Sequence, residues 1–346
     1  MMPDVGREAA RTTTWSKRSR AGAALAIAVL VSFPFYGSAF HVDLACQVFL
    51  AGVGALALTL LTGYAGQISL GHAGLLAAGA FSVGILYREF QAPFWVTLPS
   101  AAVCGAVLGL VFGLPSLRLR ALYLAVSTLG LHFLVVYLGG EYEARRGYST
   151  GILIDPPRVF GMEIYGGRWW YFILLFAVSL AYLGCRNLVR SRTGRAWGAI
   201  RSNQTVAASL GVDVSRAKVV AFIITSSMTA VAGALFAYYR GFVSVEAFSL
   251  YLAIQYVAMV IVGGMRSLAG ALLGALFVTV FPYLIEWLLG LLPLAEKQAS
   301  AVFAANYAAF GLVMILFLTL EPKGLMGILE RLAKAAARLK HRKFAP

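Results

Sequence analysis

Charged residues are scarce in this sequence, and acidic residues are the scarcest. Only 12% of its 346 residues are charged, with 14 Asp or Glu against 29 Lys or Arg. A soluble domain is about a quarter charged, so this chain lacks the polar surface that a water-soluble fold of its length needs. Hydrophobic residues make up 60% of the sequence, and the mean hydropathy is +0.80. The composition excludes an ordinary soluble globular protein.

Motifs of catalysis, nucleotide binding and metal binding are also missing. The sequence contains no Gly-Lys pair, so the phosphate-binding loop G-x-x-x-x-G-K-[ST] is absent. Residues 147–151 spell G-x-S-x-G, but in a loop between apolar blocks rather than at a strand-to-helix turn. His41, Asp43 and Cys46 match no zinc spacing. The three cysteines lie far apart and form no disulfide framework: Cys46, Cys104 and Cys185. We predict no catalytic residue, no metal and no cofactor on this chain.

The apolar residues gather in long blocks. About 18 or more apolar residues suffice to cross a bilayer as a helix. Only helices or closed barrels satisfy their backbone in lipid, and the ~10-residue alternation of barrel strands is absent. We therefore predict an all-α polytopic membrane protein of about ten transmembrane helices. The predicted spans are about 21–40, 42–62, 68–87, 93–113, 121–139, 169–185, 218–239, 251–265, 268–290 and 303–320.

The basic residues predict how these helices are oriented. Most of the net charge of +15 lies in segments 1–20, 118–120, 186–218 and 322–346. Cytoplasmic loops collect Lys and Arg, and ten spans place all four segments on that side, together with both termini. The charge thus indicates topology rather than nucleic-acid binding. The loop at 141–168, where acidic and basic residues balance, is then external.

Three regions follow from this topology: a basic cytoplasmic N-terminus at 1–20, a transmembrane domain at 21–321 and a basic tail at 322–346. The N-terminus also fits a signal peptide cleaved near Gly37–Ala39, which would leave nine spans. A long apolar block followed directly by a second span favours a retained helix. The tail at 325–343 is amphipathic, which predicts a helix on the membrane surface or, alternatively, a disordered basic tail.

The junction of the second and third blocks is rich in glycine and polar residues. Dense glycine weakens a helix and lets backbones approach closely. Irregular backbone at membrane depth is tolerated only against protein or a water-filled cavity. Broken helices of this kind line transporter substrate sites, whereas a glycine-rich helix-packing face is the alternative. The candidate pathway residues are Gly63, Tyr64, Gly66, Gln67, Ser69, Gly71, His72 and Gly74.

The central basic segment at 190–211 has a helical pattern. Apolar residues recur among basic and small ones: Trp197, Ile200, Val206 and Leu210. We predict short amphipathic helices, broken near Asn203 and ended by Gly211. The surface could dock a soluble partner, or it could be a solvated basic loop against anionic lipid headgroups. The candidate docking residues are Gly194, Arg195, Trp197, Ile200, Arg201, Ala207, Ala208, Leu210 and Gly211.

These segments carry a resemblance to a known family. Residues 63–74 resemble the signature of the branched-chain amino-acid ABC permeases, the LivH/LivM family, and most closely the LivM type. Residues 195–218 resemble that family's cytoplasmic coupling loop, within about 186–218. The run Gly263–Gly270 resembles a later motif, which adds Gly263 and Gly264 to the pathway candidates. Arg266, Ala271 and the lack of an acidic residue near the Ala207–Ala208 pair depart from the family pattern.

The resemblance implies a multi-pass permease subunit of an ATP-binding-cassette importer in the bacterial inner membrane. It implies three kinds of partner: a second, LivH-like permease, two ATPase subunits that bind ATP, and an extracytoplasmic solute-binding protein. The expected function is import of branched-chain or related amino acids, or small amides, by alternating access. An ion-coupled carrier of a small polar solute is the alternative, which the lack of an acidic residue at a clear midplane position disfavours.

Overall fold

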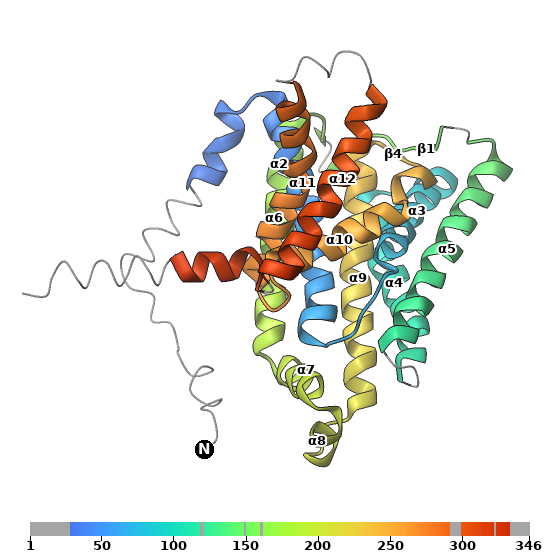
Figure 1. The fold of residues 1–346 in the computed structure, drawn as a ribbon. Coiled ribbons are helices and arrows are strands. Elements are labelled where there is room, and N and C mark those ends of the chain that lie inside the picture. Colours follow the sequence, from blue (N-terminus) through green and yellow to red (C-terminus); the bar gives the residue numbers. More distant parts are fainter. Residues whose placement is uncertain are drawn as a thin grey trace, which may run out of the picture.

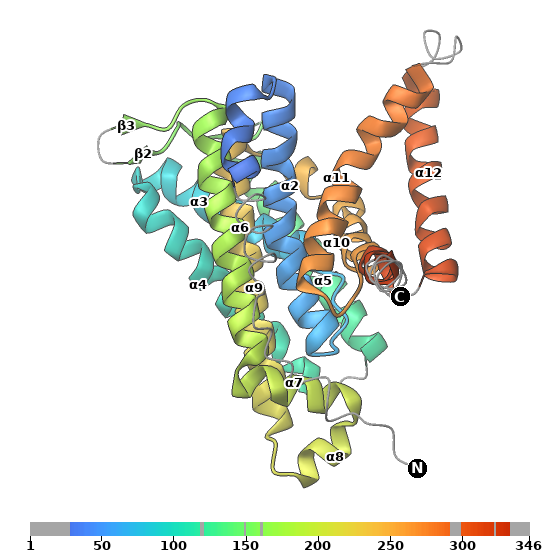
Figure 2. The same cartoon turned by 90° about the vertical axis from the view of Figure 1, so that its left-hand side faces the viewer.

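The computed structural model describes residues 28–117, 121–148, 150–159, 162–290, 299–321 and 323–332. Its long helices lie roughly side by side and form a bundle (Figure 1, Figure 2). Among the described residues, seven helical segments are long and apolar enough to cross a membrane. They are α2 (Ala39–Leu58) with its π-helical continuation η1 (Thr59–Tyr64), α3 (His72–Phe90), α4 (Phe94–Gly113), α5 (Ala121–Arg146), α6 (Gly167–Arg190), α9 (Val214–Arg240) and α11 (Leu268–Gly290).

The predicted all-α membrane architecture is confirmed, whereas the count of ten spans stays a prediction. Helix α10 (Leu250–Gly263) is apolar but has only 14 residues. Helix α12 (Ala299–Leu320) is followed, after a bend of 56°, by a helix at Gly324–Leu332. The first predicted span is described from residue 28 and is helical at 28–36. Residues 1–27 and 333–346, with most of both basic termini, lie outside the described residues.

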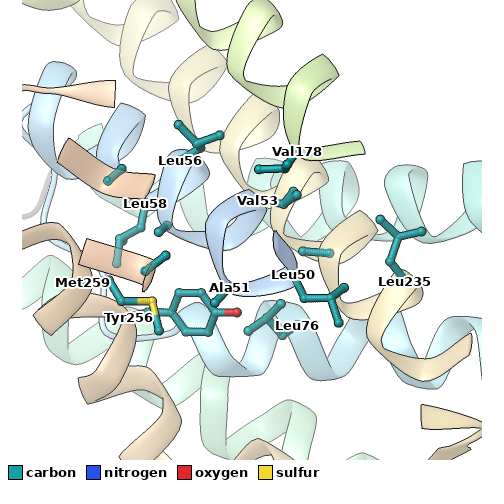
Figure 3. Close-up of a cluster of buried hydrophobic side chains, with 14 of the residues drawn as sticks. Leu50, Ala51, Val53, Leu56, Leu58, Leu76, Val178, Leu235, Tyr256 and Met259 are labelled. Carbon is teal, nitrogen blue, oxygen red and sulfur yellow. The ribbon is translucent and has the colours of Figure 1, made fainter. Parts of the chain in front are cut away.

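Helix α2 is the centre of the bundle. Every residue from Leu50 to Leu58 is buried, because α6, α9, α10 and α11 all contact this helix. Figure 3 shows part of the resulting core, with Leu50, Val53 and Leu56 of α2 facing side chains from several other helices. A helix that is hydrophobic on all sides is suited to this position. The central position of α2 matters for the site, because the half of α2 toward the strand end and the half toward the basic end contact different parts of the bundle.

The two ends of the bundle are built differently, and we name them by their contents (Figure 1). At the strand end, β1 (Ile152–Leu153) pairs antiparallel with β4 (Phe242–Val243), and β2 (Arg158–Val159) pairs with β3 (Met162–Glu163). A short 3-10 helix, η3 (Val245–Phe248), follows β4 at this end. Elsewhere in the bundle, the 3-10 helix η2 (Pro115–Leu117) follows α4. The basic end, opposite, holds α7 (Arg192–Ser202) and α8 (Gln204–Ser209). Segments 141–168 and 186–218 therefore lie at opposite ends, as the charge pattern predicts, while their sides of the membrane stay a prediction.

Candidate functional site

A cavity of about 660 Å³ lies between α2, α9, α10 and α11, in the half of the bundle toward the strand end. Its volume falls in the range of about 300–1,000 Å³ that is typical of small-molecule sites, and apolar walls are typical of them too. The apolar and aromatic lining includes Leu50, Ala51, Leu76, Phe236, Phe248, Leu252, Met259 and Val278. Such walls can hold the apolar part of a small solute.

Polar side chains gather on the side of this cavity nearest the strand end. Gln47 and Tyr239 line it, and both bind the carboxylate of Asp43: the Tyr239 hydroxyl donates to Oδ1, and Gln47 Nε2 donates to Oδ2 at 2.7 Å. Arg240 and Glu286 also line it, with the Arg240 guanidinium 5.8 Å from the centroid of the Phe236 ring. The cavity therefore offers both charges and hydrogen-bonding groups toward the strand end and apolar surface elsewhere on its walls.

The second feature is a contact at the basic end that we call the glycine junction. It consists of residues 63–67 at the end of α2, residues 263–266 after α10, Arg201 of α7, and residues 323–324. A Cβ placed on Gly63 would lie 1.8 Å from the carbonyl oxygen of Met265, and one on Gly264 would lie 2.7 Å from that of Lys323. The Tyr64 hydroxyl donates to the carbonyl oxygen of Arg266 at 2.9 Å. Backbones touch here directly, which only glycine permits.

Arg201 joins α7 to this junction. Its aliphatic stem lies on Gly66, where an added Cβ would be 3.0 Å from Cγ of Arg201, and Gly66 has a φ of +70°. Nη1 of Arg201 is buried and makes no hydrogen bond within the described part of the chain. Burial and the nearby charge of Arg266 both lower the pKa of Arg201. The junction thus contains a partly buried, unpaired cation that bears directly on the end of α2.

Gln67 is the polar residue of the junction that reaches α9. The side chain is 4% exposed, and its Nε2 donates to the carbonyl oxygen of Lys218 at 3.4 Å. Its Oε1 atom has no hydrogen-bond partner among the described residues. Gln67 therefore ties the end of α2 to the start of α9 while keeping one acceptor free.

The rest of the predicted pathway segment lies against α5. Helix α2 ends through η1 at Tyr64 and α3 begins at His72, so this stretch is a broken helix. A Cβ on Gly71 would lie 2.2 Å from the carbonyl oxygen of Thr128, and one on Gly74 would lie 2.6 Å from Cα of His132. These glycines serve close packing in this conformation. Ser69 and His72 are buried.

The structure thus brings Gly63, Tyr64, Gly66, Gln67, Gly263 and Gly264 together at the junction and places Ser69, Gly71, His72 and Gly74 along α3 and α5. None of these ten is among the described residues that line the cavity. His72 comes nearest, since its ring centroid is 4.7 Å from that of Tyr256, which does line it. Their role in translocation stays a prediction.

The two predicted short helices of the basic segment are confirmed. Ser191 caps α7 by accepting from the Gly194 N–H, and a Cβ on Gly194 would clash with the Val189 carbonyl at 2.3 Å. Asn203 separates α7 from α8 and caps α8. Its Oδ1 accepts hydrogen bonds from the backbone N–H groups of Thr205 and Val206 at 3.0 and 3.1 Å. Gly211, with a φ of +83°, then turns the chain toward α9. Local capping explains the break.

These helices have a buried face and an exposed face. Trp197, Ile200 and Ala207 are buried, and Trp197 Nε1 donates to the carbonyl oxygen of Ala217 in α9 at 2.8 Å. Ala208 is exposed, and so are Val206 and Leu210, with Leu210 76% exposed. We call these three residues the α8 patch. Arg195 lies at the surface, where it donates to the Arg190 carbonyl at 2.8 Å. The α8 patch is an exposed part of the predicted docking surface, whose role stays a prediction.

Sequence reasoning missed the cavity. Most of its lining residues sit in apolar blocks and have the same types as exposed apolar residues elsewhere in the bundle. A usable signal was present in Gln47 and Gln255, because both are polar residues inside predicted spans and both line the cavity. Polar residues at such positions usually face the interior of a bundle or a water-filled space.

The segments described here coincide with a match to known proteins. Residues 40–319 match the protein family described as the permease component of branched-chain amino acid transport systems. The match therefore covers the bundle from the start of α2 almost to the end of α12.

Individual curated relatives are permease proteins as well. The high-affinity branched-chain amino acid transport system permease protein LivM of Salmonella typhimurium is 32% identical over 278 residues, or 73% of this chain and 65% of the relative. A probable LivM of Methanocaldococcus jannaschii is 28% identical over 234 residues, 65% of this chain and 66% of the relative. The autoinducer 2 import system permease protein LsrC of an Enterobacter species is 30% identical over 211 residues, 58% of each chain. The chain thus spans just under two thirds of the length of the LivM relatives. No solved structure matches it.

Proposed function

This chain belongs to the family of permease components of branched-chain amino acid transport systems, and we propose that it forms one half of the solute pathway of an ATP-driven importer. A second, LivH-like permease forms the other half in this proposal. Two ATPase subunits bind and hydrolyse ATP, because the chain has no phosphate-binding loop of its own. An extracytoplasmic binding protein delivers the solute, and the complex sits in the bacterial inner membrane.

One observation carries the proposal: the cavity and the glycine junction are built on the same helices. Helix α2 lines the cavity with Gln47, Leu50 and Ala51, and its continuation η1 carries Gly63 in the junction. Helix α10 also lines the cavity, with Tyr256 and Met259, and it ends at Gly263 in the junction. A displacement at the junction therefore moves two walls of the cavity.

Helices α7 and α8 are placed to supply that displacement. Arg201 of α7 lies on Gly66, Trp197 of α7 bonds to Ala217, and Gln204 of α8 accepts from Lys218 Nζ at 3.0 Å. Ala217 and Lys218 belong to α9, which lines the cavity with its other end. In this proposal an ATPase docks on the α8 patch, and its motion reaches the pathway through α7, α9 and the junction.

The proposed orientation has the strand end outside and the basic end in the cytoplasm, with both termini cytoplasmic. It is supported by the Lys/Arg bias, which is informative for short loops. The cavity then lies in the half of the bundle nearer the side from which the solute arrives. The cavity's mixture of charged groups and apolar walls suits small amino acids with apolar side chains. Because one relative is an autoinducer 2 permease, other small polar solutes are further candidates.

The test is transport by the assembled complex. The chain is co-purified with its permease, ATPase and binding-protein partners, reconstituted into vesicles and supplied with radiolabelled leucine. Ala51→Phe should fill the cavity and abolish ATP-dependent uptake while the complex still assembles. Val103→Phe, an equal change at an exposed position on α4, is the control and should transport normally. Unchanged uptake in the Ala51→Phe complex would remove the cavity from the pathway.

The ion-coupled alternative makes the opposite prediction about energy. Leucine accumulation by the chain alone, driven by an ion gradient and abolished by ionophores, would establish a secondary carrier. ATPase activity of the purified chain, free of contaminants, would equally contradict the proposed division of labour. We expect neither activity, and uptake that depends on ATP and on the partner subunits.

A further inference from the structure

Below the cavity, toward the basic end, lies a layer of polar residues. Ala51, Leu76 and Ala232 line the deep part of the cavity. One helical turn nearer the basic end, the same three helices carry Gly54, His72 and Thr229, because residues three or four apart share a helix face. Helix α2 runs toward the basic end while α3 and α9 run away from it, so all three residues fall at one level.

The Tyr256 side chain separates this layer from the cavity. It lines the cavity and is 6% exposed. Its ring centroid is 4.7 Å from that of His72. A Cβ added to Gly54 would lie 2.5 Å from Cε1 of Tyr256, so the ring occupies the space that the missing side chain leaves. Figure 3 shows the ring between Met259 and Leu76, with its hydroxyl pointing away from Met259.

The layer behind Tyr256 has unused hydrogen-bonding capacity. His72 is 2% exposed, and its ring makes a weak hydrogen bond to the backbone of Gly54. Nδ1 is 3.5 Å from Oγ1 of Thr229, a long contact, and Nε2 makes no well-formed hydrogen bond within the described residues. Thr229 already donates its hydroxyl hydrogen to the Thr225 carbonyl at 2.8 Å, so its oxygen can only accept from a further group. A buried polar atom without a partner is unfavourable by about 1–3 kcal/mol.

We propose that Tyr256 is a gate between the cavity and a transit site formed by His72 and Thr229, and that this site takes the hydrogen-bonding head group of a small polar solute. The inference rests on the proposed function, since it requires that solute enters the cavity. Rotation of one ring off Gly54 uncovers His72 without moving a helix. The solute then supplies the well-formed hydrogen bond that Nε2 lacks while Tyr256 is in place.

An accessibility experiment on the assembled complex tests the gate without measuring transport. In a background free of Cys46, Cys104 and Cys185, one cysteine is placed at Gln255, in the cavity, or at Thr229, behind the gate. A membrane-impermeant thiol reagent is added from outside. We expect labelling at position 255 in every variant. We expect labelling at position 229 to be at least tenfold faster with Tyr256→Leu than with Tyr256 or with Tyr256→Phe, which retains the ring.

The outcomes separate the gate from the function on which it rests. No labelling at position 255 would mean that the cavity is not open to the outside, and the proposed function would fail. Labelling at 255 together with equally fast labelling at 229 behind an intact Tyr256 would overturn the gate. If Tyr256→Leu does not assemble, Gly54→Ala keeps Tyr256 but displaces its ring, and it should accelerate labelling at 229 in the same way.

Radiolabelled leucine uptake tests the transit site. His72→Phe keeps an aromatic ring of similar size and removes both nitrogen atoms. We expect at least a tenfold loss of uptake, with assembly and labelling at position 255 unchanged. His72→Gln, which restores a hydrogen-bonding group, should recover part of the loss. Normal uptake by the His72→Phe complex would show that the solute does not use this layer.

Discussion

The cavity and the glycine junction of this bundle differ in packing. Toward the strand end the helices separate enough to leave a cavity of about 660 Å³. At the basic end backbones meet so closely that a Cβ on Gly63 or Gly263 would come within 1.8 or 2.0 Å of a carbonyl oxygen. Close-packed protein transmits displacement because it is hardly compressible. One end is therefore suited to admitting a solute and the other to passing on a movement.

Both ends of the bundle contain ion pairs, but two arginines at the glycine junction have none among the described residues. At the strand end Arg145 pairs with Glu141 and Arg158 pairs with Glu163, each at 2.7 Å. At the basic end Arg331 pairs with Glu321, whereas Arg201 and Arg266 lie near each other and neither has an ion pair in the described part of the chain. Arg201 is partly buried, but Arg266 is exposed. Arg266 therefore fits contact with an acidic partner surface.

The largest expected effect comes from breaking the close contact at the basic end. Gly63→Ala forces the α2 terminus and the turn after α10 apart, because the contacting atom is a backbone oxygen and cannot rotate away. We expect a loss of about 3 kcal/mol of folding free energy, as for severe overpacking. Thermal unfolding of the detergent-purified chain measures it, together with the yield of folded protein.

Gly198→Ala is the matched control at the same end. Gly198 lies in α7, and an added Cβ would meet nothing within 4 Å. Alanine favours a helix over glycine by about 1 kcal/mol, so this variant should unfold slightly later than the original protein. Equal destabilisation by both substitutions would show that the close contact at Gly63 does not cause the loss of stability.

The α8 patch should give the next largest effect, on assembly rather than on folding. Ala208 is exposed whereas its neighbour Ala207 is buried. Ala208→Trp should leave the chain folded but prevent co-purification of the ATPases, or uncouple their hydrolysis from leucine uptake. Ala207→Trp should instead destabilise the chain itself, since its side chain has no room. Normal assembly and coupled uptake by the Ala208→Trp complex would mean that the ATPases dock elsewhere.

The sequence predicts the helices well and the contacts between them poorly. Long apolar blocks yield helices whatever their neighbours, so α3, α4, α9 and α11 fall close to their predicted ranges. Asn203 predicts the break between α7 and α8 because capping is a local interaction. Both features depend on residues near one another in the chain.

The cavity and the glycine junction depend on residues far apart in the chain. Gly63 and Met265 touch across about two hundred residues, and a glycine needed for packing looks the same as one needed in a pathway. Leu50 and Val278 line the cavity, yet nothing in their type distinguishes them from the lipid-facing leucines and valines of α4. Hydropathy records burial but not whether the neighbour is protein, lipid or a solute.

A smaller difference, in thermal stability, is expected between substitutions of two arginines of α7, Arg201 and Arg195. Arg201→Met keeps an apolar stem on Gly66 and removes the buried nitrogen that lacks a partner, so the isolated chain should gain about 1 kcal/mol in stability. Arg195→Met removes a hydrogen bond to the Arg190 carbonyl and should lose slightly. Thermal unfolding compares them. A clear loss of stability in Arg201→Met would show that the unpaired cation stabilises the junction.

The smallest effect is expected at the strand end, from Glu163→Gln. The ion pair with Arg158 spans the β2–β3 hairpin, and its side chains are 75% and 55% exposed. Exposed pairs contribute about 0–1 kcal/mol, and salt screens them. The variant should therefore unfold within about 1 °C of the original protein in 0.5 M NaCl, with a slightly larger difference at low salt, and leucine uptake should be normal. A deficit in uptake at unchanged stability would instead place the hairpin in contact with the binding protein. The Arg158–Glu163 pair of the strand end would then serve recognition, as the exposed Arg266 of the basic end is proposed to do.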